Sequence, residues 1–158
     1  MATAGARLIH GTAIALAGRA ALIRGAPGSG KSDLALRCLA QASSDLISGQ
    51  ALLVADDQVY AEVLDGKVQL GCPEPIRGLI EVRGIGIVAV PAQGSAVLEL
   101  LVDLVPRHEV ERLPDPEAAA ELFGIRIRRL GLYPFDASAP LKLLLALQGK
   151  GAITNGSQ

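Results

Sequence analysis

The feature that most constrains this chain is a glycine-rich segment that fits the pattern G-x-x-x-x-G-K-S. In this pattern the glycines let backbone N–H groups turn inward around phosphate oxygens, and the lysine reaches the outer phosphates. The pattern is informative where a strand precedes it and a helix follows, because the helix N-terminus adds its positive end to the site. Apolar residues 20–24 predict such a strand, and apolar residues at helical spacing predict a helix over 31–42. The segment, named here the phosphate loop, consists of Gly25, Ala26, Pro27, Gly28, Ser29, Gly30, Lys31 and Ser32.

This context predicts that the phosphate loop binds a nucleoside triphosphate, with Ser32 presenting its hydroxyl to Mg²⁺. The alternative is a glycine-rich turn in which the serine caps the helix. Two acids, Asp56 and Asp57, end the apolar run over 51–55, where a second acid near the phosphates is expected. Adjacent strand residues point to opposite faces, so only one acid can face the phosphates while the other holds a turn or the metal. A solvated strand end is the alternative for this pair.

Short apolar runs and turn dipeptides predict the rest of the fold. Gly18 and the Asp65-Gly66 dipeptide indicate two hairpins, over 12–24 and 58–70. Further strands are expected over 79–82, 85–90, 96–105 and 125–132, and further helices over 116–123 and 139–148. The predicted fold class is α/β, with a mixed β-sheet that carries the phosphate loop, helices that flank it, and hairpins at its edge.

The composition bounds the size and the environment of the protein. Its 158 residues, half of them hydrophobic, predict one domain over 1–148 followed by a flexible tail over 149–158. A formal net charge of −1 and an aromatic content of 3% disfavour a nucleic acid as the main partner. Without a signal-peptide pattern or a membrane-spanning run, a cytoplasmic protein with no membrane association is expected. Cys38 and Cys72 are too few for a disulfide framework and are interpreted as packing residues.

Four blocks of the sequence occur in an order that resembles the catalytic domain of HPr kinase/phosphorylase. They are His10-Gly11, the phosphate loop, Leu53-Val54-Ala55-Asp56-Asp57, and the segment IEVRGIGI over 80–87. The distance of 21 residues from His10 to Lys31 also matches that family. The resemblance covers about residues 8–113 well and the rest of the chain loosely.

The resemblance implies a fold similar to that of phosphoenolpyruvate carboxykinase. It also implies an enzyme that uses ATP and Mg²⁺ to phosphorylate a serine of an HPr-like phosphocarrier protein of the phosphotransferase system, working as a homo-oligomer, a hexamer in this family. By position, the family's catalytic residues correspond to Lys31, Asp57, His10 and Arg112, and its magnesium ligands to Ser32 and Glu81. In that correspondence Asp57 is the general base, Lys31 contacts the β- and γ-phosphates, and His10 lies near the transferred phosphate.

The sequence departs from the family pattern in two respects. Longer members carry an N-terminal domain, so this chain is expected to be a short form made of the catalytic core. They also carry a Pro-Val-Arg-Pro-Gly-Arg-like segment tied to phosphorylase activity, whereas the corresponding residues 133–138 are YPFDAS here. Binding inorganic phosphate beside a phosphoserine is electrostatically harder without two guanidinium groups. We therefore expect kinase activity with weak or absent phosphorylase activity.

Other functions of the same phosphate loop stay open at this point. One alternative is a nucleotide-binding switch or sensor that phosphorylates no protein, and another is a kinase for a small metabolite. The sequence also leaves open whether the phosphate donor is ATP or pyrophosphate.

Overall fold

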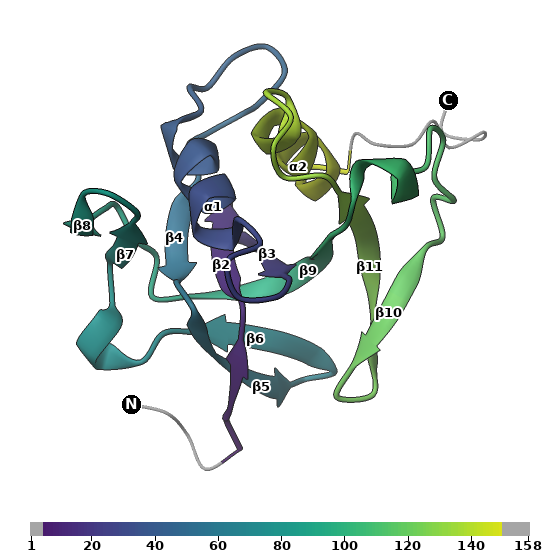
Figure 1. Ribbon diagram of the computed structural model, residues 1–158. Helices are drawn as coiled ribbons and strands as arrows, with labels where there is room; N and C mark the ends of the chain where they lie inside the picture. Colours follow the sequence, from purple (N-terminus) through teal and green to yellow (C-terminus); the bar gives the residue numbers. More distant parts are fainter. Residues whose placement is uncertain (1–4, 150–158) are drawn as a thin grey trace.

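The structure is a computed structural model, and it describes residues 5–149 as a mixed β-sheet with two helices (Figure 1). The strands are β1 (Arg7–His10), β2 (Thr12–Leu16), β3 (Arg19–Arg24), β4 (Leu52–Ala55), β5 (Gln58–Leu64), β6 (Lys67–Gly71), β7 (Leu79–Val82), β8 (Gly86–Ala89), β9 (Ser95–Leu104), β10 (Ala119–Leu122) and β11 (Ile125–Leu132). The helices are α1 (Lys31–Ala40) and α2 (Ala139–Leu147), and two 3-10 turns are η1 (Glu74–Ile76) and η2 (Arg107–Glu109).

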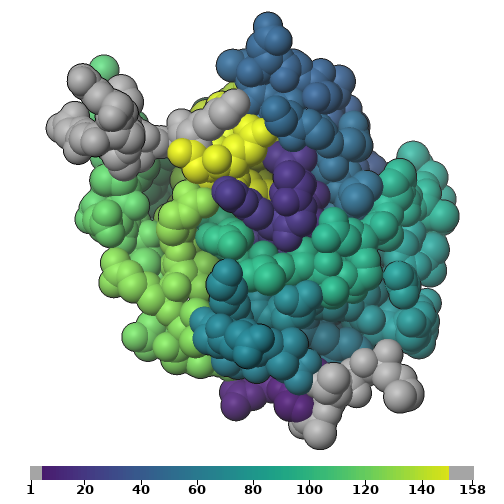
Figure 2. All heavy atoms as spheres, turned by 180° about the vertical axis from the view of Figure 1, so that it is seen from behind, coloured from purple at the N-terminus to yellow at the C-terminus, as the bar shows by residue number. Residues whose placement is uncertain are grey.

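Most of these strands belong to one sheet. The main path runs β1-β5-β6-β9-β3-β2-β4, and β11 adds to β9 and carries β10. The strands β7 and β8 form a separate hairpin. Viewed from behind, the teal β5–β6 hairpin and the green β10–β11 hairpin lie side by side on the surface (Figure 2). This mixed architecture confirms the predicted α/β fold class.

Strand β9 holds the sheet together. One of its edges pairs in parallel with β3, from Val97 to Asp103. The other edge pairs antiparallel with β6 at its start and in parallel with β11 from Leu100 to Leu104. A single strand thus contacts three neighbours, and the sheet curls where β6 gives way to β11 (Figure 1).

The sheet separates two hydrophobic layers. Successive side chains of a strand point to opposite faces of the sheet, so they join the two layers in turn. In β2, Ile14 and Leu16 join the layer under α1 and α2, while Ala13 and Ala15 join the layer on the opposite face. The neighbouring β3 alternates in the same way. Because both of its faces are covered, the strand that leads into the phosphate loop is anchored in the centre of the molecule.

The prediction of a helix over 116–123 is wrong. These residues contain β10, which pairs antiparallel with β11 and places Ala120 opposite Ile127. Phe123 and Gly124 form the turn of this hairpin, with φ of 51° and 77°, as a two-residue turn of type I′ requires. The Ala/Glu-rich composition favours a helix, but this weak local preference yields to strand pairing and to burial against the second hydrophobic layer.

The other predicted strands and helices are present, with bounds that differ by one or two residues at most. Strand β1 was not among the predictions, because its four residues show no apolar run. The predicted tail over 149–158 lies outside the described residues, apart from Gly149. No helix within residues 5–149 is long and apolar enough to cross a bilayer.

An ion-pair cluster ties the strand before the phosphate loop to its neighbours. Asp103 of β9 accepts two hydrogen bonds from Arg24 of β3, at 2.7 and 2.9 Å, and one from Arg129 of β11, at 2.6 Å. Partial burial by itself would raise the pKa of Asp103, but the hydrogen bonds from both arginines outweigh it and hold the pKa below its usual value of 3.8. The cluster therefore joins three strands directly before Gly25.

We expect Asp103→Ala to lower the free energy of unfolding at neutral pH by about 1–3 kcal/mol, because two guanidinium groups lose a charged partner. The folded-state pKa of Asp103 lies below the unfolded value, so its contribution is present above that unfolded value and disappears as the pH falls through the folded one. Urea unfolding of both proteins from pH 7 down to pH 2 measures this difference, which should shrink below about pH 4. The exposed Asp45→Ala serves as the control. A difference that stays constant over the whole pH range would contradict the prediction.

Candidate functional site

The phosphate loop connects the end of β3 to the first turn of α1 (Figure 1). The N–H of Ser29 donates to the carbonyl oxygen of Ala26 at 3.0 Å and closes a turn within the loop. Gly28 and Gly30 have φ of 76° and 102°, a region that side chains disfavour. A Cβ at Gly30 would also lie 3.1 Å from the ring of Phe135. The glycines are therefore needed for the strand–loop–helix conformation that the sequence predicted.

The loop presents groups that fit a polyphosphate anion. Lys31 Nζ donates to the carbonyl oxygens of Gly25 at 2.8 Å and Ala26 at 3.0 Å, so the loop itself holds the ammonium group. Ser29 Oγ is buried and has no hydrogen-bond partner among residues 5–149. A Cβ at Gly25 would lie only 2.5 Å from that oxygen. An unpartnered hydroxyl, a lysine and a helix N-terminus are groups that bind phosphate oxygens, and together they fit a polyphosphate.

The carboxylate of Asp56 joins three of the four sequence blocks described above. One oxygen accepts hydrogen bonds from Ser32 Oγ at 2.6 Å and from Thr12 Oγ1 at 3.0 Å. The other oxygen accepts the backbone N–H of Glu81 at 3.2 Å. Asp56 is only 7% exposed, and burial of a carboxylate is costly unless donors satisfy its oxygens. The phosphate loop, the acidic pair and the segment over 80–87 therefore meet at one buried anion.

These contacts exclude a capping role for the serine. The N-cap of helix α1 is Gly30, which has no side chain to cap the helix. The hydroxyl of Ser32 donates to Asp56 instead of capping the helix. A serine paired with a strand-end acid is also the arrangement of nucleotide-binding loops, and binding of Mg²⁺ by Ser32 stays a prediction.

Asp56 and Asp57 have the different environments that their adjacency predicted. Asp57 is exposed and adopts a positive φ of 69°, and its carbonyl oxygen accepts the N–H of Gly11 at 3.2 Å. The preceding residue, His10, is exposed and pairs with Gln58 between β1 and β5. His10 and Asp57 are thus held near each other, just beyond the end of β4.

Glu81 lies on β7 with its side chain exposed, one backbone hydrogen bond away from Asp56. Within residues 5–149, no three His, Cys, Asp or Glu side chains are grouped closely enough to hold a metal ion. Mg²⁺ commonly uses one or two protein ligands and completes its shell with phosphate oxygens and water. The binding of Mg²⁺ by Ser32 and Glu81 stays a prediction.

Within residues 5–149, no hydrogen bond or ion pair joins Arg112 to these residues. It lines a cavity of about 460 Å³ between the segment after η2, strand β11 and helix α2, together with Glu111, Arg129 and Lys142. No residue of the phosphate loop lines this cavity, nor do His10, Asp57 or Glu81. The role of Arg112 in the site stays a prediction.

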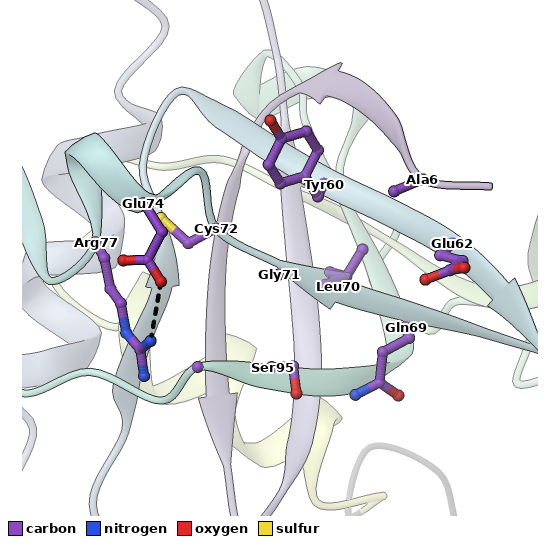
Figure 3. A pocket seen from close by; sticks show the side chains of 11 residues that line it. Ala6, Tyr60, Glu62, Gln69, Leu70, Gly71, Cys72, Glu74, Arg77 and Ser95 are labelled. Carbon is purple, nitrogen blue, oxygen red and sulfur yellow. Dashed lines mark ion pairs between the residues drawn. The ribbon is translucent and has the colours of Figure 1, made fainter. Parts of the chain in front are cut away.

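A smaller cavity of about 190 Å³ lies along β5 and β6 (Figure 3). Tyr60 and Cys72 point toward it, and Glu74 and Arg77 form an ion pair at its edge, at 3.6 Å.

Burial raises the pKa of the Cys72 thiol, and it raises that of Cys38 to about 12. Both thiols are therefore poor nucleophiles, which agrees with their interpretation as packing residues.

Sequence reasoning missed the residues that hold α1 from its other side. The guanidinium of Arg37 donates to the carbonyl oxygen of Pro134 and, at 3.3 Å, to that of Asp136. It also pairs with Asp33 at 3.0 Å. The residues that meet here are about 100 positions apart, and no local pattern announces their contact. The buried Thr12, flanked by apolar strand residues and next to His10-Gly11, is the one missed partner that the sequence hinted at.

Comparisons with known proteins show which proteins this chain is similar to. The family model described as the HPr Serine kinase C-terminal domain matches residues 2–142. An HPr kinase/phosphorylase of Bordetella pertussis is 33% identical over 135 residues, which cover 78% of this chain and 41% of that protein. One of Leptothrix cholodnii is 32% identical over 148 residues, which cover 86% of this chain and 43% of that protein. The chain thus spans less than half the length of these curated relatives.

A solved structure described as the Hpr(Ser) kinase/phosphatase from Coxiella burnetii has the same fold. It superposes with a TM-score of 0.73 over 91% of this chain and 90% of that one, at 22% sequence identity. The mixed sheet with its two helices is therefore the arrangement of that protein as well.

We expect Lys31→Met to weaken binding of a magnesium–triphosphate ligand by about 10- to 100-fold, because a charged hydrogen bond contributes roughly 1.5–3 kcal/mol. Isothermal titration calorimetry with inorganic tripolyphosphate and Mg²⁺ measures the loss. Lys67→Met, at the exposed turn of β5 and β6, is the matched control and should bind like the wild type. Equal affinity of the Lys31→Met protein and the wild type would show that the loop does not hold the phosphates through this lysine.

Proposed function

The chain belongs to the family of the HPr serine kinase C-terminal domain, and on this premise we propose that it is an ATP-dependent kinase that phosphorylates a serine of an HPr-like phosphocarrier protein. The observation that carries the proposal is the carboxylate of Asp56, which joins Ser32 of the phosphate loop to the backbone of Glu81. Through it, an anion-binding loop lies beside exposed acids that a protein substrate can reach. The proposal includes a homo-oligomer, by family resemblance, and a cytoplasmic location, from the sequence pattern described above.

The phosphate loop binds the β- and γ-phosphates of ATP in this proposal. Lys31 leaves the carbonyl oxygens of Gly25 and Ala26 and donates to phosphate oxygens instead. Ser29 Oγ, buried and unpartnered within the described chain, gains a phosphate oxygen as its acceptor. Ser32 and Glu81 would hold Mg²⁺, whose positive charge would offset the charge on the phosphate oxygens.

Asp57 acts as the general base. A serine hydroxyl has a pKa far above 7, so its attack on the γ-phosphorus is favoured by a carboxylate that accepts the proton. The serine oxygen forms a bond to phosphorus, the bond from phosphorus to the β–γ bridging oxygen breaks, and ADP leaves. Asp57 is exposed, whereas the carboxylate of Asp56 already accepts three hydrogen bonds. Asp57 is therefore the acid available for proton transfer, with the exposed His10 close to the same strand end.

The proposal excludes efficient phosphorolysis of the phosphoserine. Residues 133–138 supply a carboxylate, Asp136, in place of guanidinium groups. Asp136 is already paired with Arg107 at 2.6 Å, and Arg37 is engaged with backbone carbonyl oxygens of the same segment. Binding a second, free phosphate anion there is unfavourable, because the neighbouring cations are already engaged.

A nucleotide-binding switch is the second candidate function. It would use the same phosphate loop but would need no general base. The two functions differ in one measurable product, a phosphorylated carrier.

We expect Asp57→Asn to lower the rate of carrier phosphorylation by about 10²- to 10⁴-fold, the usual contribution of a general base. Asparagine tolerates the positive φ of this position, so the fold and ATP binding should persist. Mass spectrometry of HPr-like carriers, incubated with enzyme, Mg²⁺ and ATP, measures the product. Asp65→Asn is a matched control, since Asp65 also has a positive φ, of 51°, but lies at the β5–β6 turn. Absence of any phosphoserine with the wild-type enzyme would refute the kinase and favour the switch.

Phosphorolysis is tested by incubating the enzyme with phosphoserine carrier and excess inorganic phosphate. We expect pyrophosphate release at most about a hundredth as fast as carrier phosphorylation, because charged hydrogen bonds to the attacking phosphate are missing. An enzyme-coupled pyrophosphate assay measures the rate. Rapid release would show that a phosphate site exists without the arginine-containing segment.

A further inference from the structure

Phe135 is an exposed aromatic side chain directly beside the phosphate loop. The residue is 61% exposed, although the chain has only two Phe and two Tyr residues. Its edge lies against Gly30, where an added Cβ would approach the ring carbons to 3.1 and 3.2 Å. Gly30 is followed in the phosphate loop by Lys31 and Ser32. An aromatic surface therefore adjoins the place where the phosphates bind.

The backbone that carries this ring is held on both sides. Arg37 of α1 donates to the carbonyl oxygens of Pro134 and Asp136, the residues before and after Phe135. The Arg107 side chain pairs with Asp136 and also lies over the ring of Tyr133, 4.4 Å from its centroid. Ion pairs and hydrogen bonds from α1 and η2 thus fix the segment against the phosphate loop.

Tyr133 orients the ring further. The Tyr133 and Phe135 rings meet edge to face, with centroids 5.7 Å apart and planes at 79°. This is a favourable aromatic geometry. One aromatic ring and the flank of Gly30 therefore support Phe135, while most of its surface faces solvent.

A planar π surface next to a phosphate site suits one part of a nucleotide, its base. Stacking of a base on an aromatic side chain is tolerant of sequence, because every base has a π face. Pyrophosphate and tripolyphosphate carry phosphates but no base, so stacking on this surface adds nothing to their binding affinity. The ring thus distinguishes two classes of phosphate donor that the phosphate loop alone does not.

We propose that Phe135 is a stacking platform for the base of the bound nucleotide, and that it selects a nucleoside triphosphate over inorganic polyphosphates as the phosphate donor. This inference rests on the proposed function, because it assigns the donor of the same site. It adds a specificity residue on the segment that replaces the arginine-containing one of longer family members.

The test compares ATP with tripolyphosphate, which shares its three phosphates and lacks the base. Phe135→Ala should weaken ATP binding by about 5- to 150-fold, the range for loss of one base–aromatic stack. Tripolyphosphate binding should stay unchanged, and Phe135→Tyr should bind ATP like the wild type. Leu64→Ala, which shortens an apolar side chain that is 48% exposed on the β5–β6 hairpin, is the control. Calorimetry with Mg²⁺ present measures all affinities.

A fluorescence measurement gives an independent readout. The chain contains no tryptophan, so Phe135→Trp introduces a single emitter at the platform. ATP should quench this emission strongly, and tripolyphosphate at saturation should leave it nearly unchanged.

The outcomes separate this inference from the proposed function. Equal loss of ATP and tripolyphosphate affinity in Phe135→Ala would show that the ring only supports the phosphate loop. Unchanged affinity for both ligands would show that the ring does not contribute to binding. Both results overturn the stacking platform, while a wild type that still phosphorylates the carrier keeps the proposed kinase. A wild type that binds no ATP overturns both.

Discussion

The buried carboxylate of Asp56 is the interaction on which the site depends. A charged group out of contact with water is tolerated only when donors surround it, and here the donors are Thr12, Ser32 and the backbone of Glu81. They come from β2, from the first turn of α1 and from β7. One anion thus sets the relative positions of the phosphate loop, the strand-end acids and the β7–β8 hairpin. It also leaves the neighbouring Asp57 at the surface, in a left-handed conformation that turns the chain toward β5.

The position of the phosphate loop is supported from both of its ends. Before it, Asp103 binds Arg24 and Arg129 and thereby joins β3, β9 and β11. After it, Arg37 on α1 holds the connection between β11 and α2. A loop rich in glycine has high conformational freedom, so its functional geometry relies on this fixed framework of strands and ion pairs.

The proposed chemistry divides among three surfaces that meet at the loop. The loop and Lys31 take the phosphates, the strand end with Asp57 faces the incoming alcohol, and the ring of Phe135 faces the base. The third surface lies on residues 133–138, where the rings of Tyr133 and Phe135 meet edge to face.

The sequence by itself determined the features that depend on neighbouring residues. The phosphate loop, the turns at Gly18 and Asp65-Gly66 and the helix after Lys31 all follow from local backbone preferences and periodicity. The sequence also predicted different environments for Asp56 and Asp57, although both residues lie just beyond β4 and Asp57 has a positive φ of 69°. Tertiary structure decided the rest: β10 became a strand through pairing with β11, against its composition. It also pairs Ser32 with Asp56, 24 positions away. Arg37 contacts Pro134 and Asp136, which are 97 and 99 positions away. The physical reason is that hydrogen bonds and ring contacts between distant segments are set by how the sheet curls around β9, and a single sequence read in short windows carries no record of that curl.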